Sequence, residues 1–251
     1  SQLVSFLIIL FKVLKNERIR NISSEYLVPK FLFFKNIFFQ SMPISVSICG
    51  YALAAAIIFT YVGQSGEYAV AGYGVGTRIE QVVLLPILGI NTAIISIIAQ
   101  NYGANNLVRI KETYFTAIKY AFIIMITAGT LVFLSASVIT SFFSSDPEVI
   151  EYGKRYLKIS AFVLPAYPVF FLSNGFFMAL KKSENAMISN FFRNVLNPIA
   201  VFYIAKYINA SFETFFWLWV GINWFFSISY FFIIIYYFKL KLNKSSAVVQ
   251  P

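Results

Sequence analysis

The segment QVVLLPILGINTAIISIIAQNYGANNLV, residues 81–108, contains no Asp, Glu, Lys or Arg. A helix needs about 20 apolar residues to cross the hydrocarbon core of a bilayer, so this segment is long enough to do so. Three further segments of comparable length are also uncharged, at residues 120–145, 159–180 and 214–238. Together the four segments predict an integral membrane protein made of helices rather than a soluble domain.

The composition agrees with this interpretation and excludes several kinds of chemistry. Of the 251 residues, 59% are hydrophobic and 12% are charged, against about 25% charged residues in soluble domains. The chain has one cysteine, Cys49, and no histidine, which excludes a disulfide framework, a thiol metal site and histidine-based catalysis. We therefore expect no metal site, no cofactor and no catalytic residue, and a function other than that of an enzyme.

Apolar length, read together with Gly, Pro and charged residues, predicts one partial and six complete membrane spans. We expect the end of a transmembrane helix at residues 1–14, a cytoplasmic connector at 15–33, a six-helix bundle at 34–240 and a cytoplasmic tail at 241–251. The chain begins inside an apolar run without an initiator methionine, so we expect that its N-terminal part is missing. The complete spans are expected at residues 34–62, 69–101, 113–143, 152–180, 185–208 and 212–238.

The net charge of +10 predicts orientation rather than a nucleic-acid partner, because cytoplasmic loops carry an excess of Lys and Arg. Thirteen Lys and Arg residues lie on the side of the membrane that holds the connector, the loops near residues 109 and 181, and the C-terminal tail. Three lie on the opposite side, Lys154, Arg155 and Lys158. This bias predicts a cytoplasmic C-terminus in a multi-pass protein of the cell inner membrane.

Polar side chains inside the spans must face protein or a water-filled cavity. Asn36 and Gln40 recur at helical spacing in the first complete span, and Asn190 and Arg193 recur in the fifth. Stripes of this kind line cavities, but they also serve helix packing through interhelical hydrogen bonds. The sequence leaves both interpretations open.

Arg78, Glu80 and Arg193 are charged residues at membrane depth, where each costs at least about 2.5 kcal/mol. Because Arg78 and Glu80 are two positions apart, they do not face each other on a helix. We expect each of them to meet a partner on another helix or to face an aqueous cavity. A role in transport and a purely structural role, through ion pairing or snorkelling, both account for these charges.

Residues 70–80 read VAGYGVGTRIE, Leu85-Pro86 follows, and the segment ends in the signature formed by Gln100, Asn101, Gly103 and Ala104. This stretch resembles the eighth helix of multidrug and toxic compound extrusion (MATE) transporters, with their Gln-Asn-x-Gly-Ala motif. The resemblance implies two six-helix bundles related by an axis along the membrane normal. This chain would then be the second bundle, preceded by the end of helix six.

The resemblance further implies the export of amphipathic, often cationic, drugs or metabolites in exchange for protons or sodium ions. One sodium-coupled branch of the family carries a glutamate in helix seven and an aspartate in helix ten, at positions that fall near Tyr51 and Tyr167. No carboxylate occurs between Glu25 and Glu67 or between residues 151 and 184. We therefore expect that this ion site is absent from the chain and that the main coupling carboxylate lies in the missing first bundle.

The candidate cavity residues are Asn36, Gln40, Tyr51, Asn91, Tyr167 and Asn190, with Arg78 and Glu80 organising the outer part of the eighth helix. The expected partners are the lipid bilayer, a small organic cation and the N-terminal six-helix bundle of the same protein. Two other functions stay open, a flippase for lipid-linked precursors of the same superfamily and a membrane assembly subunit that does not transport.

Overall fold

The computed structural model describes residues 2–15 and 31–247; the side chains of residues 241–247, and many of those between 32 and 48, lie outside this description. The chain divides between Met42 and Pro43 into two units. The first contains α1 (Gln2–Leu14) and the beginning of α3 (Phe31–Gly63). Helix α1 exposes apolar side chains, among them Leu3 and Phe11. An exposed apolar helix of this kind suits contact with lipid or with another membrane helix.

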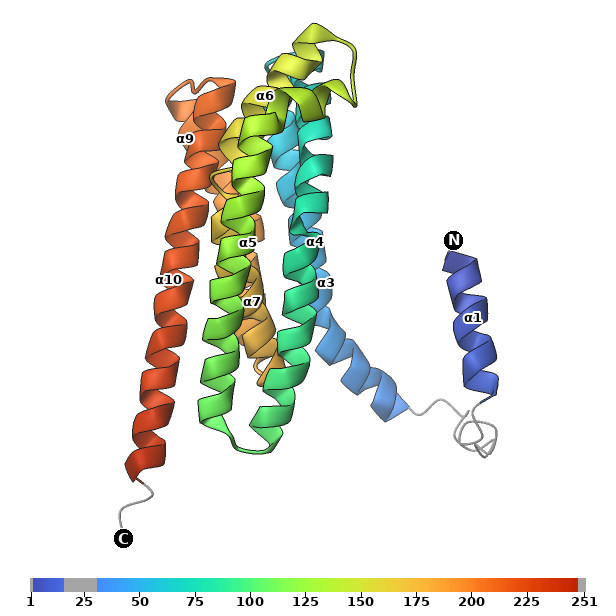
Figure 1. Cartoon of the computed structure of the whole chain (residues 1–251), viewed down its shortest axis with the longest axis vertical. Helices are drawn as coiled ribbons and strands as arrows, with labels where there is room; N and C mark the ends of the chain where they lie inside the picture. The colour runs from blue at the N-terminus through green and yellow to red at the C-terminus, as the bar shows by residue number, and fades with distance from the viewer. Residues whose placement is uncertain (1, 16–30, 248–251) are drawn as a thin grey trace. The chain divides into compact units, whose positions relative to one another are not determined.

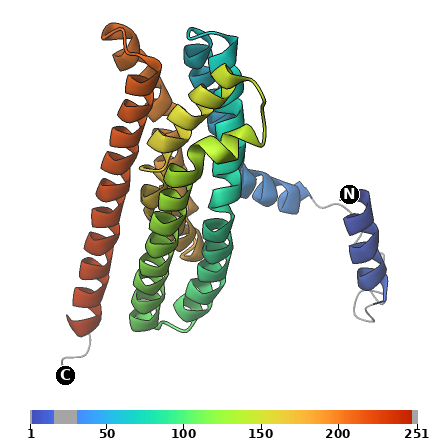
Figure 2. The same ribbon diagram turned by 45° about the horizontal axis from the view of Figure 1, so that its top comes forward.

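The second unit holds the rest of α3 and a set of helices that run alongside one another, with successive long helices pointing in opposite directions (Figures 1 and 2). No strand occurs in the described parts of the chain. After α3, the segments are α4 (Glu67–Gly103), α5 (Leu107–Ser141), α6 (Pro147–Ser160), the short 3₁₀ helix η2 (Leu164–Ala166), α7 (Tyr167–Ala179), α8 (Ser183–Phe191), the π-helical segment η3 (Phe192–Leu196), α9 (Asn197–Tyr207) and α10 (Phe212–Ala247).

Short turns with local caps connect these helices. The Asp146 side chain accepts a hydrogen bond from the backbone N–H of Glu148 at 2.9 Å, and Pro147 occupies the first position of α6, where no N–H is needed. Asn106 caps α5 in the same way, by accepting from the backbone of Arg109 at 3.0 Å. The chain leaves α4, α7 and α9 through residues in the left-handed conformation that commonly follows a helix, Asn105, Lys181 and Asn209.

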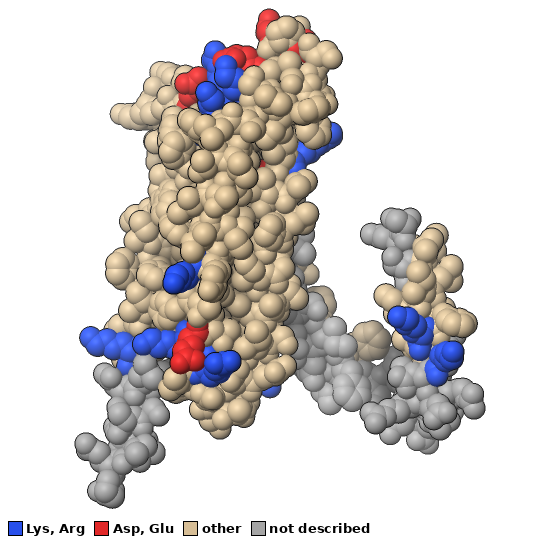
Figure 3. Space-filling model, viewed as in Figure 1, with Lys and Arg blue, Asp and Glu red and all other residues tan. Residues whose placement is uncertain are grey.

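Four described segments are long and apolar enough to cross a membrane, Glu67–Gly103, Leu107–Ser141, Pro147–Ala179 and Phe212–Leu240. Helices α4 and α5 contain 37 and 35 residues. At about 1.5 Å per residue they exceed the roughly 30 Å of the hydrocarbon core, so their ends extend beyond it. On the face in Figure 3, the charged side chains of the second unit gather mainly toward its two ends, with a largely uncharged band between them.

The span expected as one helix at residues 152–180 is interrupted between α6 and α7. Pro165 and Pro168 lie at this break, and neither has a backbone N–H with which to continue an α-helical ladder. Side chains of α10 satisfy carbonyl groups there. The indole Nε1 of Trp224 donates to the Phe162 carbonyl at 2.8 Å, and the Ser227 hydroxyl donates to the Ala166 carbonyl at 3.0 Å. Backbone polar groups freed inside a membrane must find such partners.

The span expected at residues 185–208 is helical as far as Tyr207 but irregular. Its middle, Phe192–Leu196, is a π-helix that leads into Asn197 and Pro198. Because Pro198 has no N–H to donate to the preceding turn, the α-helical hydrogen-bond pattern cannot continue through it. Single π-helical turns inside α-helices are frequent at functional sites. Arg193 lies in this turn.

Candidate functional site

A cavity of about 490 Å³ lies among α3, α4, α7 and η3, with additional residues from α6, α8 and α10. Two of its lining residues are charged, Glu80 of α4 and Arg193 of η3. Aromatic rings form much of the wall, contributed by Tyr51, Tyr73, Tyr156, Tyr167, Phe170, Phe171, Phe216 and Trp219. Ligand sites commonly combine apolar and aromatic walls with a few convergent polar groups, as this cavity does.

Two tyrosine hydroxyls hold the Glu80 carboxylate. Tyr167 of α7 donates to Oε1 at 2.5 Å, and Tyr156 of α6 donates to Oε2. Both tyrosines are buried, so the carboxylate lies in a site with little water around its partners. Hydrogen bonds to a charged acceptor are stronger than neutral ones, and two of them fix the direction in which the carboxylate points.

Glycines on α4 allow α6 to bring Tyr156 to Glu80. Gly72, Gly76 and Glu80 are spaced by four residues and therefore lie on one face of the helix. A Cβ atom at Gly76 would lie 2.2 Å from Cδ1 of Tyr156, and one at Gly72 would lie 2.7 Å from the backbone nitrogen of Gly153. The two helices approach this closely because neither glycine has a side chain. The glycines of segment 70–80 thus allow Tyr156 to come within hydrogen-bonding distance of the Glu80 carboxylate.

Arg193 is held by an amide and by aromatic faces. Its Nε donates to Asn223 Oδ1 at 3.2 Å, and Asn223 in turn donates to the Trp219 carbonyl at 2.8 Å. The guanidinium carbon lies 4.1 Å from the ring centroid of Phe170 and 5.0 Å from that of Tyr167. Such cation–π contacts contribute about 0.5–2 kcal/mol each. Tyr167 therefore touches both charges of the cavity, with its hydroxyl on Glu80 and its ring beside Arg193.

The structure brings five of the predicted residues together at this cavity, Tyr51, Glu80, Tyr167, Asn190 and Arg193. Asn190 accepts a hydrogen bond from the Asn174 amide at 3.2 Å.

Asn91 and Arg78 lie elsewhere, although both belong to α4. Asn91 packs against α7, where a Cβ atom at Gly175 would lie 2.0 Å from its Oδ1, and this buried oxygen has no hydrogen-bond partner among the described residues. Arg78 is exposed and does not line the cavity. Asn36 and Gln40 belong to the first part of α3, and their side chains lie outside the described residues.

The signature residues also lie away from the cavity, at the end of α4. Gln100 donates to Ser96 Oγ at 3.4 Å, and the Asn101 amide donates to the Ile97 carbonyl at 2.8 Å. Gly103 is the last residue of the helix, and Ala104 follows it as the C-cap. This segment therefore shapes the turn from α4 into α5.

Tyr156 is the contact that the sequence analysis missed. Tyrosines are common at membrane interfaces, and nothing local in the sequence distinguishes Tyr156 from the other tyrosines of the chain. The available signal is indirect. Glu80 needs a partner from another helix, and the face of α4 that carries Gly72 and Gly76 is the face that a second helix approaches most closely.

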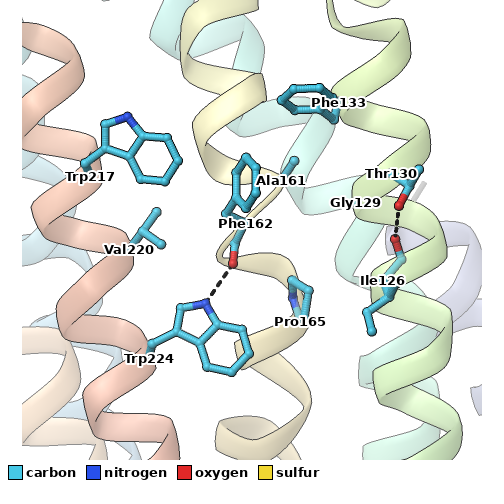
Figure 4. Close-up of a pocket in the computed structure, with 10 residues that line it drawn as sticks. All are labelled: Ile126, Gly129, Thr130, Phe133, Ala161, Phe162, Pro165, Trp217, Val220 and Trp224. Carbon is cyan, nitrogen blue, oxygen red and sulfur yellow. Dashed lines mark hydrogen bonds between the residues drawn. The ribbon is translucent and has the colours of Figure 1, made fainter.

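A second hollow, of about 440 Å³, lies between α5 and α10 beside the break between α6 and α7 (Figure 4). None of its lining residues is acidic or basic. Two of its polar side chains bond to nearby carbonyls, since Trp224 donates to Phe162 and the Thr130 hydroxyl donates to Ile126 of its own helix at 2.9 Å. We refer to it as the α5–α10 groove. It offers apolar contact but no charge to recognise an ion.

Comparison with known proteins finds relatives named as a transporter and as a probable multidrug resistance protein. It is 25% identical over 158 residues to the FAD transporter of Shewanella oneidensis, a match that covers 63% of this chain and 35% of that protein. It is 26% identical over 164 residues to the probable multidrug resistance protein YpnP of Bacillus subtilis, a match that covers 65% of this chain and 34% of that protein. In both cases the match spans only part of the relative's length.

Among solved structures, a crystal structure of a MATE in complex with MaL6 matches with a TM-score of 0.82 at 20% identity. The match covers 96% of this chain and 54% of that one. This likeness confirms the fold expected from the sequence, an all-α membrane bundle. The match to the family model called MatE covers residues 43–203, more than half of the 251 residues. The chain therefore belongs to the MatE family.

Proposed function

We propose that this chain is the half of a secondary antiporter that supplies a binding wall for exported amphipathic organic cations. The observation that carries the proposal is the Glu80 carboxylate, which is held by two tyrosine hydroxyls at the edge of an aromatic cavity. A carboxylate attracts the charged group of such a compound, and ring faces bind both its cationic and its apolar parts. Tyr73, Phe216 and Trp219 supply rings in the same cavity.

Exchange for protons or sodium ions completes the proposal. The two bundles of such a transporter rock against each other around a central site. In this proposal the main coupling carboxylate belongs to the first bundle of the full-length protein. Glu80 then binds the substrate and is not the main ion site. A full-length protein in which every first-bundle carboxylate is neutralised is expected to lose ion-coupled export. Ion-coupled export that persists in that variant contradicts this division of roles.

We propose the membrane orientation that the distribution of Lys and Arg predicts. The loops at Arg109 and Lys181 and the C-terminus then lie in the cytoplasm. The substrate is then exported across the cell inner membrane. Cysteines placed one at a time in these loops, in a protein whose Cys49 is replaced by serine, test the orientation by their reaction with an impermeant thiol reagent. Labelling of Arg109→Cys in intact cells contradicts it.

Ethidium efflux from energised cells that express the full-length protein tests the function, with the proton and sodium gradients collapsed separately. Efflux that is lost with one gradient supports antiport and identifies the ion. Absence of efflux under all conditions contradicts the proposal and favours a lipid-linked precursor flippase or an assembly subunit.

Glu80→Gln tests the role of the carboxylate. Because charge-assisted hydrogen bonds contribute about 1.5–3 kcal/mol, we expect ethidium efflux to fall by about tenfold or more. Glu112→Gln is the matched control, since Glu112 is exposed and its side chain lies 3.5 Å from Arg109 at the surface. Equal efflux by Glu80→Gln and the native protein, at equal amounts in the membrane, contradicts the proposed role.

A further inference from the structure

The cavity contains one positive and one negative side chain that do not form an ion pair. Within the described parts of the chain, the ion pairs join other residues, namely Arg109 with Glu112, Glu151 with Lys154 and Arg155, and Arg155 with Glu213. Glu80 and Arg193 are the only charged residues among those that line the cavity. The two opposite charges therefore face the same space without neutralising each other by direct contact.

Neutral groups hold each charge in place. Glu80 accepts hydrogen bonds from Tyr156 and Tyr167, while the Arg193 guanidinium lies against aromatic rings and donates to Asn223. Tyr167 lies between the two charges, because its hydroxyl bonds to Glu80 and its ring centroid is 5.0 Å from the Arg193 guanidinium carbon.

No ion pair in the described parts of the chain includes Arg193, and a cation removed from water at this depth is costly even though the Glu80 charge in the same cavity attracts it. Aromatic faces and an amide offset part of this cost. A carboxylate forms two parallel hydrogen bonds with a guanidinium and is the ligand that an arginine of this kind fits best. An anion brought by a ligand would complete the site.

We propose that Arg193 binds the carboxylate of the transported compound, so that the cavity takes amphoteric aromatic molecules. Their cationic group lies at Glu80, their ring lies against the aromatic wall, and their anionic group lies at Arg193. This inference rests on the proposed function and deepens it, because the only charged group that a simple organic cation binds in this cavity is Glu80, whereas a ligand with a carboxylate also binds Arg193. Between two ligands with the same cationic ring system, Arg193 favours the one that also carries a carboxylate, while Glu80 binds the cationic group of both.

The space around Arg193 suits such a group. Asn190 and Asn194, its neighbours along the helix, line the same cavity. A second cavity of about 390 Å³ between α7, α8 and α10 is also lined by Arg193, together with Phe170. Arg193 therefore forms part of the wall between two cavities, and the anionic end of a ligand has room on either side of it.

A rhodamine carboxylate and its methyl ester test the inference, because the two dyes share their cationic ring system and differ in the anionic group. We expect the purified full-length protein to bind the carboxylate more tightly than the ester by about tenfold, the value of one charge-assisted pair. In Arg193→Gln the ratio of the two affinities is expected to fall to about one. The control Arg109→Gln alters an exposed arginine at the membrane surface and should keep the native ratio.

Three results would overturn the inference. The first is equal affinity of the native protein for the ester and the carboxylate. The second is no binding of either dye. The third is an equal loss of affinity for both dyes in Arg193→Gln, which would leave the ratio of the two affinities unchanged. The comparison within the native protein needs no substitution and stands even if Arg193→Gln does not fold. Ethidium efflux separates this inference from the proposed function. Efflux without a preference for the carboxylate overturns the role of Arg193 alone, whereas absence of efflux overturns the proposed function.

Discussion

The cavity beside Glu80 and the α5–α10 groove are similar in volume, about 490 and 440 Å³, but they differ in chemistry. The cavity places a carboxylate and a guanidinium among aromatic rings. The groove is also rich in aromatic rings, yet no acidic or basic residue lines it, and its Trp224 indole and Thr130 hydroxyl donate to nearby backbone carbonyls. The difference teaches that hollow space alone does not identify a transport site in a membrane bundle. The positions of charged residues and of the groups that hold them identify such a site.

Gly76→Ala has the largest expected effect, because it acts on the contact that builds the cavity. The new Cβ atom would lie 2.2 Å from the Tyr156 ring and would push α6 away from Glu80. Overpacking of this kind costs about 1–3 kcal/mol in the free energy of unfolding. We expect a lower unfolding temperature of the purified full-length protein and a strong loss of ethidium efflux.

Gly74→Ala is the matched control for that change. A Cβ atom there meets nothing within 4 Å, and alanine is the better helix former by about 1 kcal/mol. It should therefore leave efflux unchanged and stability equal or higher. Equal behaviour of the two variants would show that the close contact between α4 and α6 does not determine the cavity.

Trp224→Phe has an intermediate expected effect and tests the groove. It removes the indole hydrogen bond to the Phe162 carbonyl at the helix break. The loss of one such bond costs about 1 kcal/mol, so the unfolding temperature should fall modestly. Ethidium efflux per folded molecule should stay at the native value, because Trp224 lies outside the cavity. A specific loss of efflux in a stable protein would assign a transport role to the groove and remove the contrast between the two hollows.

The sequence predicts the membrane bundle and the charges of the cavity, but not the neutral residues that hold those charges. The long uncharged segments were sufficient to predict an all-α membrane bundle, because the bilayer dictates the length of apolar helix. The cost of charge in hydrocarbon likewise singled out Glu80 and Arg193 without any structure. The cost of charge in hydrocarbon does not indicate which neutral residue will bond to a buried charge. Tyr156 is 76 positions from Glu80, and its sequence surroundings resemble those of many other aromatic residues.

Helical periodicity predicts a face but not where along that face a cavity ends. Asn91 lies beyond Leu88, the last residue of α4 that lines the cavity, where α7 comes close because Gly175 has no side chain. The break between α6 and α7 is a similar case. The prolines were visible in the sequence, but the groups of α10 that satisfy the exposed carbonyls come from more than 60 residues away.

Arg78→Gln has the smallest expected effect and tests the comparison at its most direct point, two charged residues on one helix. Arg78 and Glu80 are two positions apart in sequence and equally costly by the rule that selected them, yet only Glu80 lines the cavity. Arg78 is exposed, and no ion pair in the described ranges includes it. An exposed substitution of this kind changes the free energy of unfolding by less than about 0.5 kcal/mol. We expect ethidium efflux and the binding of both rhodamines to remain native in Arg78→Gln. A loss of efflux comparable to that of Glu80→Gln would mean that charge at membrane depth, rather than contact with the cavity, determines which residues of α4 serve transport.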